Sequence, residues 1–524
     1  MKNMYLRKWL LACVCTTAIS LHAANPYLPL WEHVPDGEPY VFEDPDNPGH
    51  FRVYIYGSHD VMRTGYCGRD QVVWSADVND LNHWRYDGVS LYVPYDAEGR
   101  PVNPDGQADV LYAPDIAVVK GKDGRNTYYL YPNNQGGGRN GMVAKSDRPD
   151  GPFKVCNWSK TDPKKTDGVL TFDPAVFVDD DGRVYGYWGF GHSNGAELDP
   201  NTMATLKPGT QIVKDMVSGL DQEGPFRFYE ASSIRKIKDK YVFIYSRLTR
   251  NGDLGLPQSN YTLAYAYSNH PLGPWTFGGT IIDGRARGRD AQGNVIPTAT
   301  PDGNTHGSIA EINGQWYVFY HRQTGTDEYA RQAMVAPINV NVTEGEDGKV
   351  EISEGEYTSE GFETNGLNPS EWHAAGIACY YTGPRPAIHK WPNNIFSGSY
   401  IDNTEACNVV NNTNGSTVGY KYFNFGNNKF SLLTLRLIPQ GVNGTIHIWM
   451  DSPFASLKGA QKGAVKGREI GSITLTADMA QTSTELSAHL SQLSKIKGKH
   501  ALYLTFSSNT PDASLCTLTE LRFQ

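Results

Sequence analysis

Three acidic residues, far apart in the chain, have the types and settings that proton-transfer chemistry requires. Asp36, Asp173 and Glu230 each stand at or just before the start of a run of alternating apolar and aromatic residues. A carboxyl group acts as a general base when it is ionised, and as a general acid when a raised pKa keeps it protonated near neutral pH. Burial of Glu230 among the aromatic residues at 226–229 would raise its pKa in this way. A salt bridge from Glu230 to a neighbouring arginine is equally compatible with this stretch alone.

A repeated strand pattern would bring these three residues together. Between residues 39 and 342, a run rich in Tyr and Val recurs five times, followed by a second strand-like run and a turn. The runs lie at 52–57, 127–131, 183–188, 241–246 and 315–320. Units of about 55 to 75 residues built from short strands are typical of a β-propeller. We therefore predict an all-β fold with a five-bladed β-propeller, whose innermost strands would send the three carboxyl groups into one funnel.

A second domain is indicated after a charged, Gly-rich stretch. Short alternating runs at 430–437, 444–450, 472–475, 500–506 and 517–523 predict a β-sandwich, which is jelly-roll-like. We divide the chain into a propeller at 25–345, a linker at 346–364 and a sandwich at 365–524.

Composition limits the classes of function. The net charge of -9 comes without any cluster of Lys and Arg, so nucleic-acid binding is not expected.

A basic start and an apolar run at 9–21 precede the small residues Ala23 and Ala24, which is the layout of a signal peptide at 1–23. We expect export to the periplasm or the cell exterior, without a membrane span. The spacing of the cysteines indicates neither a disulfide scaffold nor a zinc site.

Several motifs, in order, resemble those of glycoside hydrolase family 43. They are Asp36-Gly37-Glu38-Pro39, Tyr56-Gly57-Ser58-His59-Asp60, Ala113-Pro114-Asp115-Ile116, Phe172-Asp173-Pro174, Glu230-Ala231-Ser232, Asn304-Thr305-His306-Gly307-Ser308 and Phe319-Tyr320-His321-Arg322. The resemblance covers about residues 25 to 345. It implies a five-bladed propeller that hydrolyses glycosidic bonds with inversion, usually in polysaccharides that contain arabinose or xylose.

The resemblance also assigns roles to the three carboxyl groups. It implies that Asp36 is the general base, Glu230 the general acid, and Asp173 the residue that tunes the pKa of the acid. Inversion places the acid and the base roughly 6.5 to 9.5 Å apart, which leaves room for a water molecule. Glu38 remains an alternative base, because Glu38-Pro39 can be aligned with the family's Asp-Pro dipeptide, and Glu223 is a rival for the acid.

Four further residues are candidates for contacts around the carboxyl groups. Asp115 is expected to bind sugar hydroxyls, although an Asx-type turn cap is nearly as good an interpretation. Trp188 would form a stacking floor, or else belong to the core. Arg322 would bind substrate or neutralise the carboxylates, or else pair at the surface. His306 resembles the family's axial histidine, which implies a structural calcium or sodium ion in the channel; the chemistry itself needs no cofactor.

The function predicted first is the removal of terminal α-L-arabinofuranosyl residues from plant cell-wall polysaccharides or oligosaccharides by a monomer. A β-xylosidase or another exo-glycosidase of the family is the first alternative, and a glycan-binding propeller without catalysis is the second. Retaining five-bladed fructosidases share the architecture, but their Asn-Asp-Pro-Asn and Arg-Asp-Pro segments do not occur here. The C-terminal sandwich resembles carbohydrate-binding modules of family 6, through the runs at 444–451 and 498–504.

Overall fold

The protein is all-β, as predicted. The computed structural model describes residues 24–289, 295–296, 303–362, 364–388, 390, 393–454 and 467–524. The predicted signal peptide at 1–23 lies outside these residues. Besides strands, they contain three short 3-10 helices, η1 (Asp253–Gly255), η2 (Ala375–Ile377) and η3 (Leu493–Lys495). No helix in the described part of the chain is long and apolar enough to cross a membrane.

Five antiparallel sheets follow one another along the first part of the chain. The first contains β1 (Glu38–Glu43), β2 (Phe51–Gly57), β3 (Asp70–Asp77) and β4 (Asp80–Tyr92). The second contains β5 (Tyr112–Lys120), β6 (Asn126–Asn133), β7 (Ala144–Ser146) and β8 (Lys154–Val155). The third contains β9 (Ala175–Val178), β10 (Val184–Trp188), β11 (Asn194–Leu198) and β12 (Val213–Lys214). The fourth contains β13 (Phe228–Ile237), β14 (Lys240–Arg247), β15 (Thr262–Ser268) and β16 (Thr276–Asp283). The fifth contains β19 (Ser308–Ile312), β20 (Gln315–Thr324) and β21 (Ala330–Ile338).

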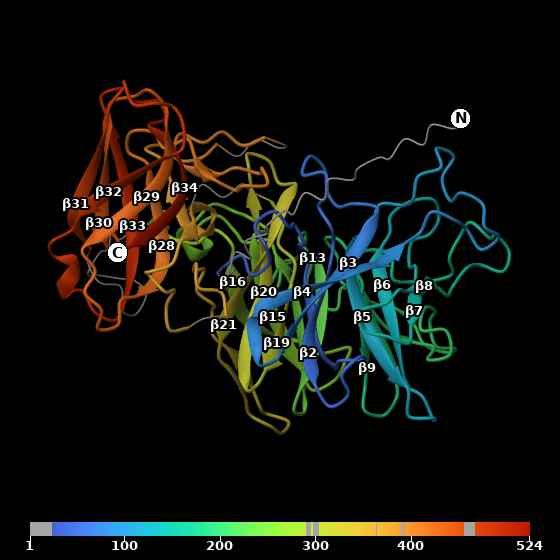
Figure 1. Ribbon diagram of the computed structural model, residues 1–524. Helices are drawn as coiled ribbons and strands as arrows, with labels where there is room; N and C mark the ends of the chain where they lie inside the picture. The colour runs from blue at the N-terminus through green and yellow to red at the C-terminus, as the bar shows by residue number, and fades with distance from the viewer. Residues whose placement is uncertain are drawn as a thin grey trace, which may run out of the picture.

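The first strands of these sheets contact one another in turn. β1 contacts β5, β5 contacts β9, β9 contacts β13 and β13 contacts β19, and β19 returns to β1. This is the arrangement of blades in a five-bladed propeller, and it forms the body on the right of Figure 1. The Tyr- and Val-rich runs of the sequence are the second strands of the blades, so each innermost strand lies just before its run.

Apolar side chains from neighbouring sheets fill the space between the blades. Separate core clusters lie between the first and second, second and third, third and fourth, and fourth and fifth sheets. A further cluster joins the fifth sheet to the first, where Val53 and Ile55 pack with Phe319. Each such side chain contributes about 1.5–3 kcal/mol when it is fully buried. The blades therefore hold their innermost strands, and the residues that begin them, in fixed positions.

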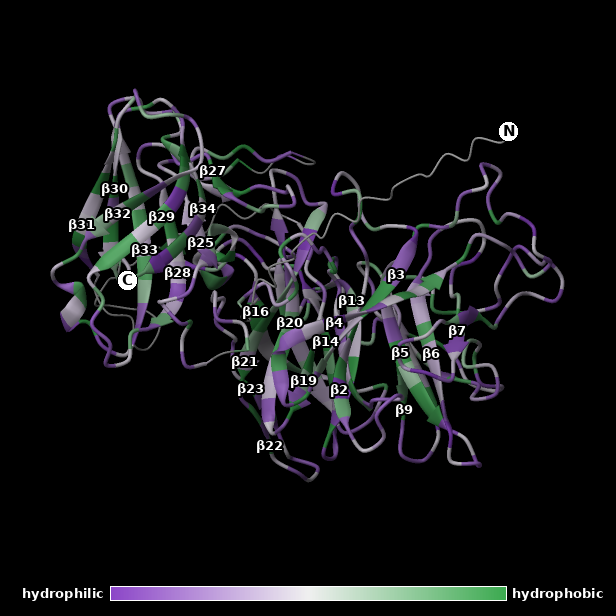
Figure 2. Ribbon diagram, viewed as in Figure 1, coloured by the Kyte–Doolittle hydropathy of each residue, from purple (hydrophilic) through white to green (hydrophobic). Residues whose placement is uncertain are grey.

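Two further sheets form the C-terminal β-sandwich, on the left of Figure 1. One contains β26 (Tyr400–Ile401), β27 (Val409–Val410), β34 (Cys516–Phe523), β29 (Leu432–Pro439) and β32 (Thr484–His489), with β24 (His373–Ala374) beside β34. The other contains β25 (Tyr380–Thr382), β28 (Thr417–Asn424), β33 (Lys499–Ser508), β30 (Gly444–Met450) and β31 (Arg468–Leu475). Hydrophobic and hydrophilic positions mix along the strands of both domains (Figure 2), as expected when one face of a strand is buried. One apolar core lies between the two sheets.

The segment at 346–364, expected to be a linker, packs on the propeller over much of its length. Within it, β23 (Val350–Ile352) pairs with β22 (Val340–Val342), which precedes the segment. The side chains of Tyr357 and Phe362 are buried in propeller cores. A small hairpin of β17 (Gly288–Arg289) and β18 (Val295–Ile296) completes the described strands.

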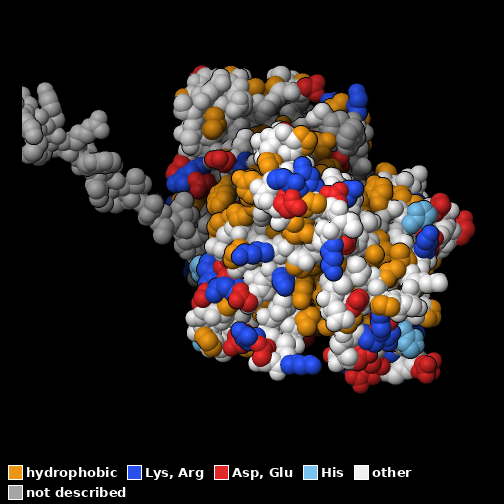
Figure 3. All heavy atoms as spheres, turned by 90° about the vertical axis from the view of Figure 1, so that its right-hand side faces the viewer, with side chains coloured by type: hydrophobic (Ala, Val, Ile, Leu, Met, Phe, Trp, Pro, Cys, Tyr) orange, Lys and Arg blue, Asp and Glu red, His pale blue; other side chains and the backbone are white. Residues whose placement is uncertain are grey.

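Charged side chains of both signs are interspersed on one face of the molecule. On the face shown in Figure 3, Lys and Arg side chains lie next to Asp and Glu side chains. This face has no extended basic patch of the kind that binds a nucleic-acid backbone.

Candidate active site

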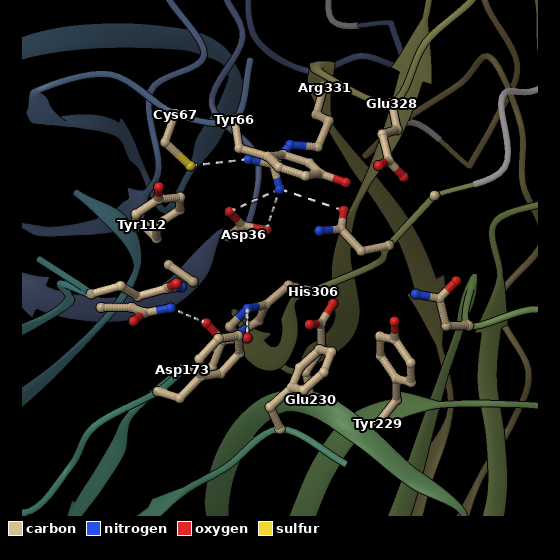
Figure 4. A pocket seen from close by; sticks show the side chains of 18 of the residues that line it. Asp36, Tyr66, Cys67, Tyr112, Asp173, Tyr229, Glu230, His306, Glu328 and Arg331 are labelled. Atoms are coloured by element: carbon tan, nitrogen blue, oxygen red, sulfur yellow. Dashed lines mark hydrogen bonds and ion pairs between the residues drawn. The ribbon is translucent and has the colours of Figure 1, made fainter. Parts of the chain in front are cut away.

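A cavity of about 710 Å³ lies where the innermost strands of the propeller begin. It contains all three predicted catalytic carboxyl groups, which Figure 4 shows pointing into it. The other lining residues are Tyr66, Cys67, Tyr112, Ala113, Asn133, Gln135, Phe172, Phe190, Tyr229, Asn260, Gly303, Asn304, His306, Glu328, Arg331 and Asn394. Most of these side chains are polar or aromatic, as a sugar site requires.

The backbone at the three carboxyl residues departs from regular strand geometry. Asp36 precedes β1 with φ 60°, and Asp173 precedes β9 with φ 41°. Such a left-handed conformation costs a residue other than glycine roughly 1–3 kcal/mol and is concentrated at functional sites. Glu230 lies in β13 between two shifts in register with β14, and Ala231 beside it has φ 69°. These irregularities turn the three side chains out of the sheets and into the cavity.

Asp36 is held as a carboxylate by a set of buried donors. Ser58 Oγ donates a hydrogen bond to Asp36 Oδ2 at 2.6 Å, and Arg331 Nη1 lies 3.0 Å from Oδ1 and 3.1 Å from Oδ2. Burial alone would raise the pKa of Asp36, but Arg331, with smaller effects from His321 and His306, outweighs it and lowers the pKa below the ordinary value. An ionised carboxylate is the state that a general base needs.

Arg331 is the main functional residue that the sequence did not reveal. Its side chain is 2% exposed, and its Nε and Nη2 donate to the two oxygens of Asp60 at 2.8 and 2.9 Å. Asp60 and Asp36 thus flank a single guanidinium group. His321 also helps to position Asp36. Its Nδ1 accepts a hydrogen bond from the backbone N–H of Asp36 at 3.3 Å, and its Nε2 donates to the carbonyl oxygen of Asn304 at 3.0 Å.

Glu230 and Asp173 have the opposite electrostatic surroundings. Asn133 Nδ2 donates to Asp173 Oδ1 at 2.6 Å, and the N–H of Ala231 donates to Oδ2 at 3.2 Å. Burial, and then the charge of Asp36, raise the pKa of Asp173 to about 7. Burial, followed by the charges of Asp173 and Asp36, raises the pKa of Glu230 well above its ordinary value. Glu230 is therefore the carboxyl group most suited to keep a proton and donate it.

His306 lines the cavity between these groups, as Figure 4 shows. Burial lowers its pKa to about 4, so its imidazole is neutral at pH 7. Its Nδ1 lies 3.8 Å from Asp173 Oδ2, and its buried Nε2 has no hydrogen-bond partner among the described residues. The described residues contain no group of three His, Cys, Asp or Glu side chains arranged to hold a metal ion. The predicted channel ion stays a prediction.

The structure does not place Asp115 in the cavity, which corrects its predicted role in binding sugar. Asp115 is 1% exposed, accepts a hydrogen bond from Tyr40 at 2.8 Å, and accepts another from the backbone N–H of Val176 at 2.6 Å. It lies farther along β5 than Tyr112 and Ala113, which do line the cavity. Its carboxyl group ties the first three blades together beneath the site.

Glu38, the alternative base, also lies outside the cavity lining. Its side chain is fully buried and binds Arg235 Nη2 at 2.9 Å. Burial raises the pKa of Glu38 to about 7. Because a base must reach a water molecule beside the substrate, the position of Asp36 fits that role better.

Trp188 and Arg322 are likewise absent from the cavity lining, which corrects their predicted roles in binding substrate, while the alternative interpretation of Trp188 as a core residue agrees with the structure. Trp188 packs in the core between the second and third blades, and the rings at the cavity belong to other residues. Among them, Phe190 lies 5.2 Å from Phe172 and 5.1 Å from Tyr229, measured between ring centroids.

Arg322 binds residues away from the cavity. Its guanidinium group donates to Gln332, to the carbonyl oxygen of Ala378 at 2.9 Å and to that of Gly376 at 2.5 Å, and the last two residues belong to the second domain. Because side chains alternate along a strand, His321 faces the site and Arg322 next to it faces away.

Comparison with known proteins identifies the chain. Residues 54–345 match the model of glycosyl hydrolases family 43. A xylosidase/arabinosidase of Thermoclostridium stercorarium is 33% identical over 532 residues, which cover 94% of this chain and 98% of that protein. The chain belongs to glycosyl hydrolase family 43. As a member of this family, the protein is a glycosidase that acts on polysaccharide substrates.

Other similar proteins align with most of the chain. An arabinoxylan arabinofuranohydrolase of Paenibacillus polymyxa is 26% identical over 499 residues, covering 93% of this chain and 70% of that protein. The crystal structure of a family 43 arabinoxylan arabinofuranohydrolase from Bacillus subtilis, in complex with cellotetraose, aligns with 96% of this chain at 20% identity and a TM-score of 0.45, covering 99% of that chain. The family match begins at residue 54, so Asp173 and Glu230 lie within it and Asp36 precedes it.

Proposed function

We propose that the protein is an inverting exo-glycosidase that removes terminal α-L-arabinofuranosyl residues from plant cell-wall polysaccharides or oligosaccharides. The observation that carries the acid-base part of this proposal is that one cavity holds Asp36 beside the guanidinium group of Arg331 and Glu230 near the carboxyl group of Asp173, surroundings that lower the pKa of Asp36 and raise that of Glu230. Inversion requires one ionised and one protonated carboxyl group at the same time. The names of the relatives, which include a xylosidase/arabinosidase and an arabinoxylan arabinofuranohydrolase, support the arabinofuranosyl part.

Each carboxyl group then has one task. Asp36, ionised beside Arg331, takes a proton from a water molecule as the water attacks the anomeric carbon. Glu230 gives its proton to the glycosidic oxygen as the bond to the leaving saccharide breaks. Asp173 raises the proton affinity of Glu230 through its charge and fixes the backbone N–H of Ala231 next to it. After one turnover the protons are exchanged with solvent, and both groups return to their starting states.

A β-xylosidase is the second candidate. The relative from Thermoclostridium stercorarium carries both activities in its name, and a β-xylosidase of Xylanibacter ruminicola is 30% identical over 210 residues, 34% of this chain and 56% of that protein. A pentose of either kind requires the same pair of carboxyl groups. The sugar released is therefore the quantity to measure.

The test is to incubate the protein with arabinan, arabinoxylan, arabinogalactan and xylo-oligosaccharides and to identify the sugar set free. The proposal expects arabinose, and proton NMR during the first minutes should show the anomer with configuration opposite to that of the substrate. Release of xylose alone would replace the arabinofuranosidase assignment with the second candidate. Release of the anomer with retained configuration would contradict the roles of Asp36 and Glu230.

We also propose that the protein is exported, because the basic and apolar start of the chain supports cleavage after about residue 23. Sequencing the N-terminus of the protein recovered from its producing cells tests this. An N-terminus that still begins with Met1 would contradict it.

A further inference from the structure

The second domain contributes a residue to the wall of the catalytic cavity. Asn394, from the loop between β25 and β26, lines the same cavity as Asp36 and Glu230. Its backbone N–H donates to the carbonyl oxygen of Thr326 at 2.6 Å, and its side-chain Nδ2 donates to the same oxygen at 3.2 Å. Beside it, Asn393 forms an antiparallel bridge with Asp327. The side chain of Asn394 is thus held in place by the propeller loop that joins β20 to β21.

The interface between the domains fixes this position. The fully buried side chain of Arg322 joins β20 to the carbonyl oxygens of Gly376 and Ala378. The N–H of Gly325 donates to the carbonyl oxygen of Ile401 at 2.7 Å. Leu30, near the start of the propeller chain, packs against the core of the sandwich. A buried, hydrogen-bonded interface of this kind does not allow the two domains to move freely, so Asn394 stays at the cavity.

The level of Asn394 within the cavity follows from the direction of β20. This strand passes His321, which contacts Asp36, and continues to Thr324 before the loop that holds Asn394. Thr324, where β20 ends, lies three positions beyond His321, and a strand rises about 3.3 Å per residue; Thr326 follows in the loop. Asn394 therefore lies farther out than the carboxyl groups at the strand starts. A terminal sugar bound between Asp36 and Glu230 would leave the rest of its chain to pass this outer level.

We propose that Asn394 contacts the leaving saccharide, the part of the substrate beyond the bond that is cleaved, and so makes the second domain a part of the active site. Its ligand is the neighbouring sugar of a pentose-containing chain. The proposal rests on the glycosidase activity of the family and holds for either pentose. It gives the sandwich a role in choosing substrates without requiring an independent sugar site on its surface.

The test compares two substrates in the full-length protein. An aryl glycoside carries no saccharide on the leaving side, whereas an arabinoxylo-oligosaccharide does. With Asn394→Ala we expect kcat/KM to fall about three- to tenfold for the oligosaccharide, the loss typical of one neutral hydrogen bond, and less than twofold for the aryl glycoside. Equal losses on both substrates, or no loss on either, would overturn the proposal.

Asn403→Ala is the matched control. Asn403 also belongs to the second domain and contacts the propeller, through its Nδ2 and the carbonyl oxygen of Arg63 at 3.4 Å, but it is absent from the cavity lining. This variant should leave both substrates unchanged within twofold, with a thermal midpoint close to that of Asn394→Ala. The same selective loss in Asn403→Ala would trace the effect to docking of the domain and overturn the contact. If the protein releases xylose, an aryl xyloside and a xylo-oligosaccharide replace the pair, so failure of the arabinose assignment is seen separately.

Discussion

The two sides of the cavity differ in the charges that surround their carboxyl groups, although both groups are buried. Asp36 is 3% exposed and Glu230 is 8% exposed, yet the pKa is lowered at Asp36 and raised at Glu230. Arg331 contacts Asp36 directly, whereas the largest charge effect on Glu230 comes from another carboxylate, Asp173. Burial raises the pKa on both sides, so the neighbouring charge determines which group gives a proton and which takes one.

The largest expected effect is that of removing the acid. Glu230→Gln should lower kcat on a polysaccharide or oligosaccharide about 10⁴-fold, the upper range for general acid catalysis, with little change in binding. An aryl glycoside with an acidic phenol as leaving group should lose much less, because that oxygen leaves without a proton. Initial rates on both substrates measure the difference. Glu223→Gln is the control, since Glu223 is exposed and outside the cavity lining; a loss in Glu223→Gln that matched Glu230→Gln would move the acid to Glu223.

Removing the base should affect kcat in a way that distinguishes Asp36 from Glu230. Asp36→Asn should lower kcat about 10³-fold on every substrate, because attack by water is required whichever group leaves. On an aryl glycoside with an acidic phenol, kcat of Asp36→Asn should therefore fall as much as on other substrates, whereas kcat of Glu230→Gln should fall less. The measurement is kcat across a series of aryl glycosides whose phenols differ in pKa. A strong dependence of the loss on the leaving group would reverse the assignments.

Asp173→Asn should weaken the acid side alone. Without the negative charge of Asp173 the pKa of Glu230 falls, so Glu230 loses its proton at a lower pH. The alkaline limb of the plot of kcat/KM against pH should move to lower pH, with a loss of about 10- to 100-fold near neutral pH. The acid limb should stay or move slightly to lower pH, because Asp36 loses a neighbouring negative charge. An alkaline limb that stayed in place would show that Asp173 does not tune Glu230.

Arg331→Lys should weaken the base side alone. Lys keeps a positive charge but not the bidentate geometry, so the pKa of Asp36 rises toward the value that burial favours. Since Asp36 must be ionised to act, activity should be lost at a higher pH on the acid limb, with about a tenfold loss near pH 5. Replacement by Met should also lower the free energy of unfolding by about 3–5 kcal/mol, because Asp36 and Asp60 lose their buried partner. An unchanged acid limb in Arg331→Lys would contradict the role of Arg331.

The smallest effect on catalysis is expected from Glu38→Gln. It disturbs the buried pair with Arg235 and should lower stability, measured by denaturant unfolding, by a few kcal/mol. The kcat of the folded protein should stay within about threefold of the wild type, because Glu38 does not reach the cavity. A loss as large as that of Asp36→Asn would make Glu38 the base.

The fold could be predicted from the sequence because the strand-like runs of the propeller and of the sandwich are local patterns. Five Tyr- and Val-rich runs are the second strands of five sheets, and the run at 444–450 coincides with β30. The three carboxyl residues could be found because each stands beside a strand start, and the cavity brings them together.

Contacts between distant segments were harder to predict. The motif at 319–322 points to Arg322, which follows His321, whereas Arg331, on the next strand, is the residue that reaches Asp36. The alternation of side chains along β20 could have excluded Arg322, but only the folded blade shows which arginine crosses to the first sheet. Asn394 reaches the cavity from another domain, and no local pattern in the sequence indicates such a contact.

The most direct test of the central claim is a neutron crystal structure of the deuterated protein at pH 6, which shows where the exchangeable protons lie. The different surroundings of the two groups predict a deuteron on the carboxyl group of Glu230 and none on Asp36. A deuteron on Asp36 together with an ionised Glu230 would contradict the assignment of base and acid.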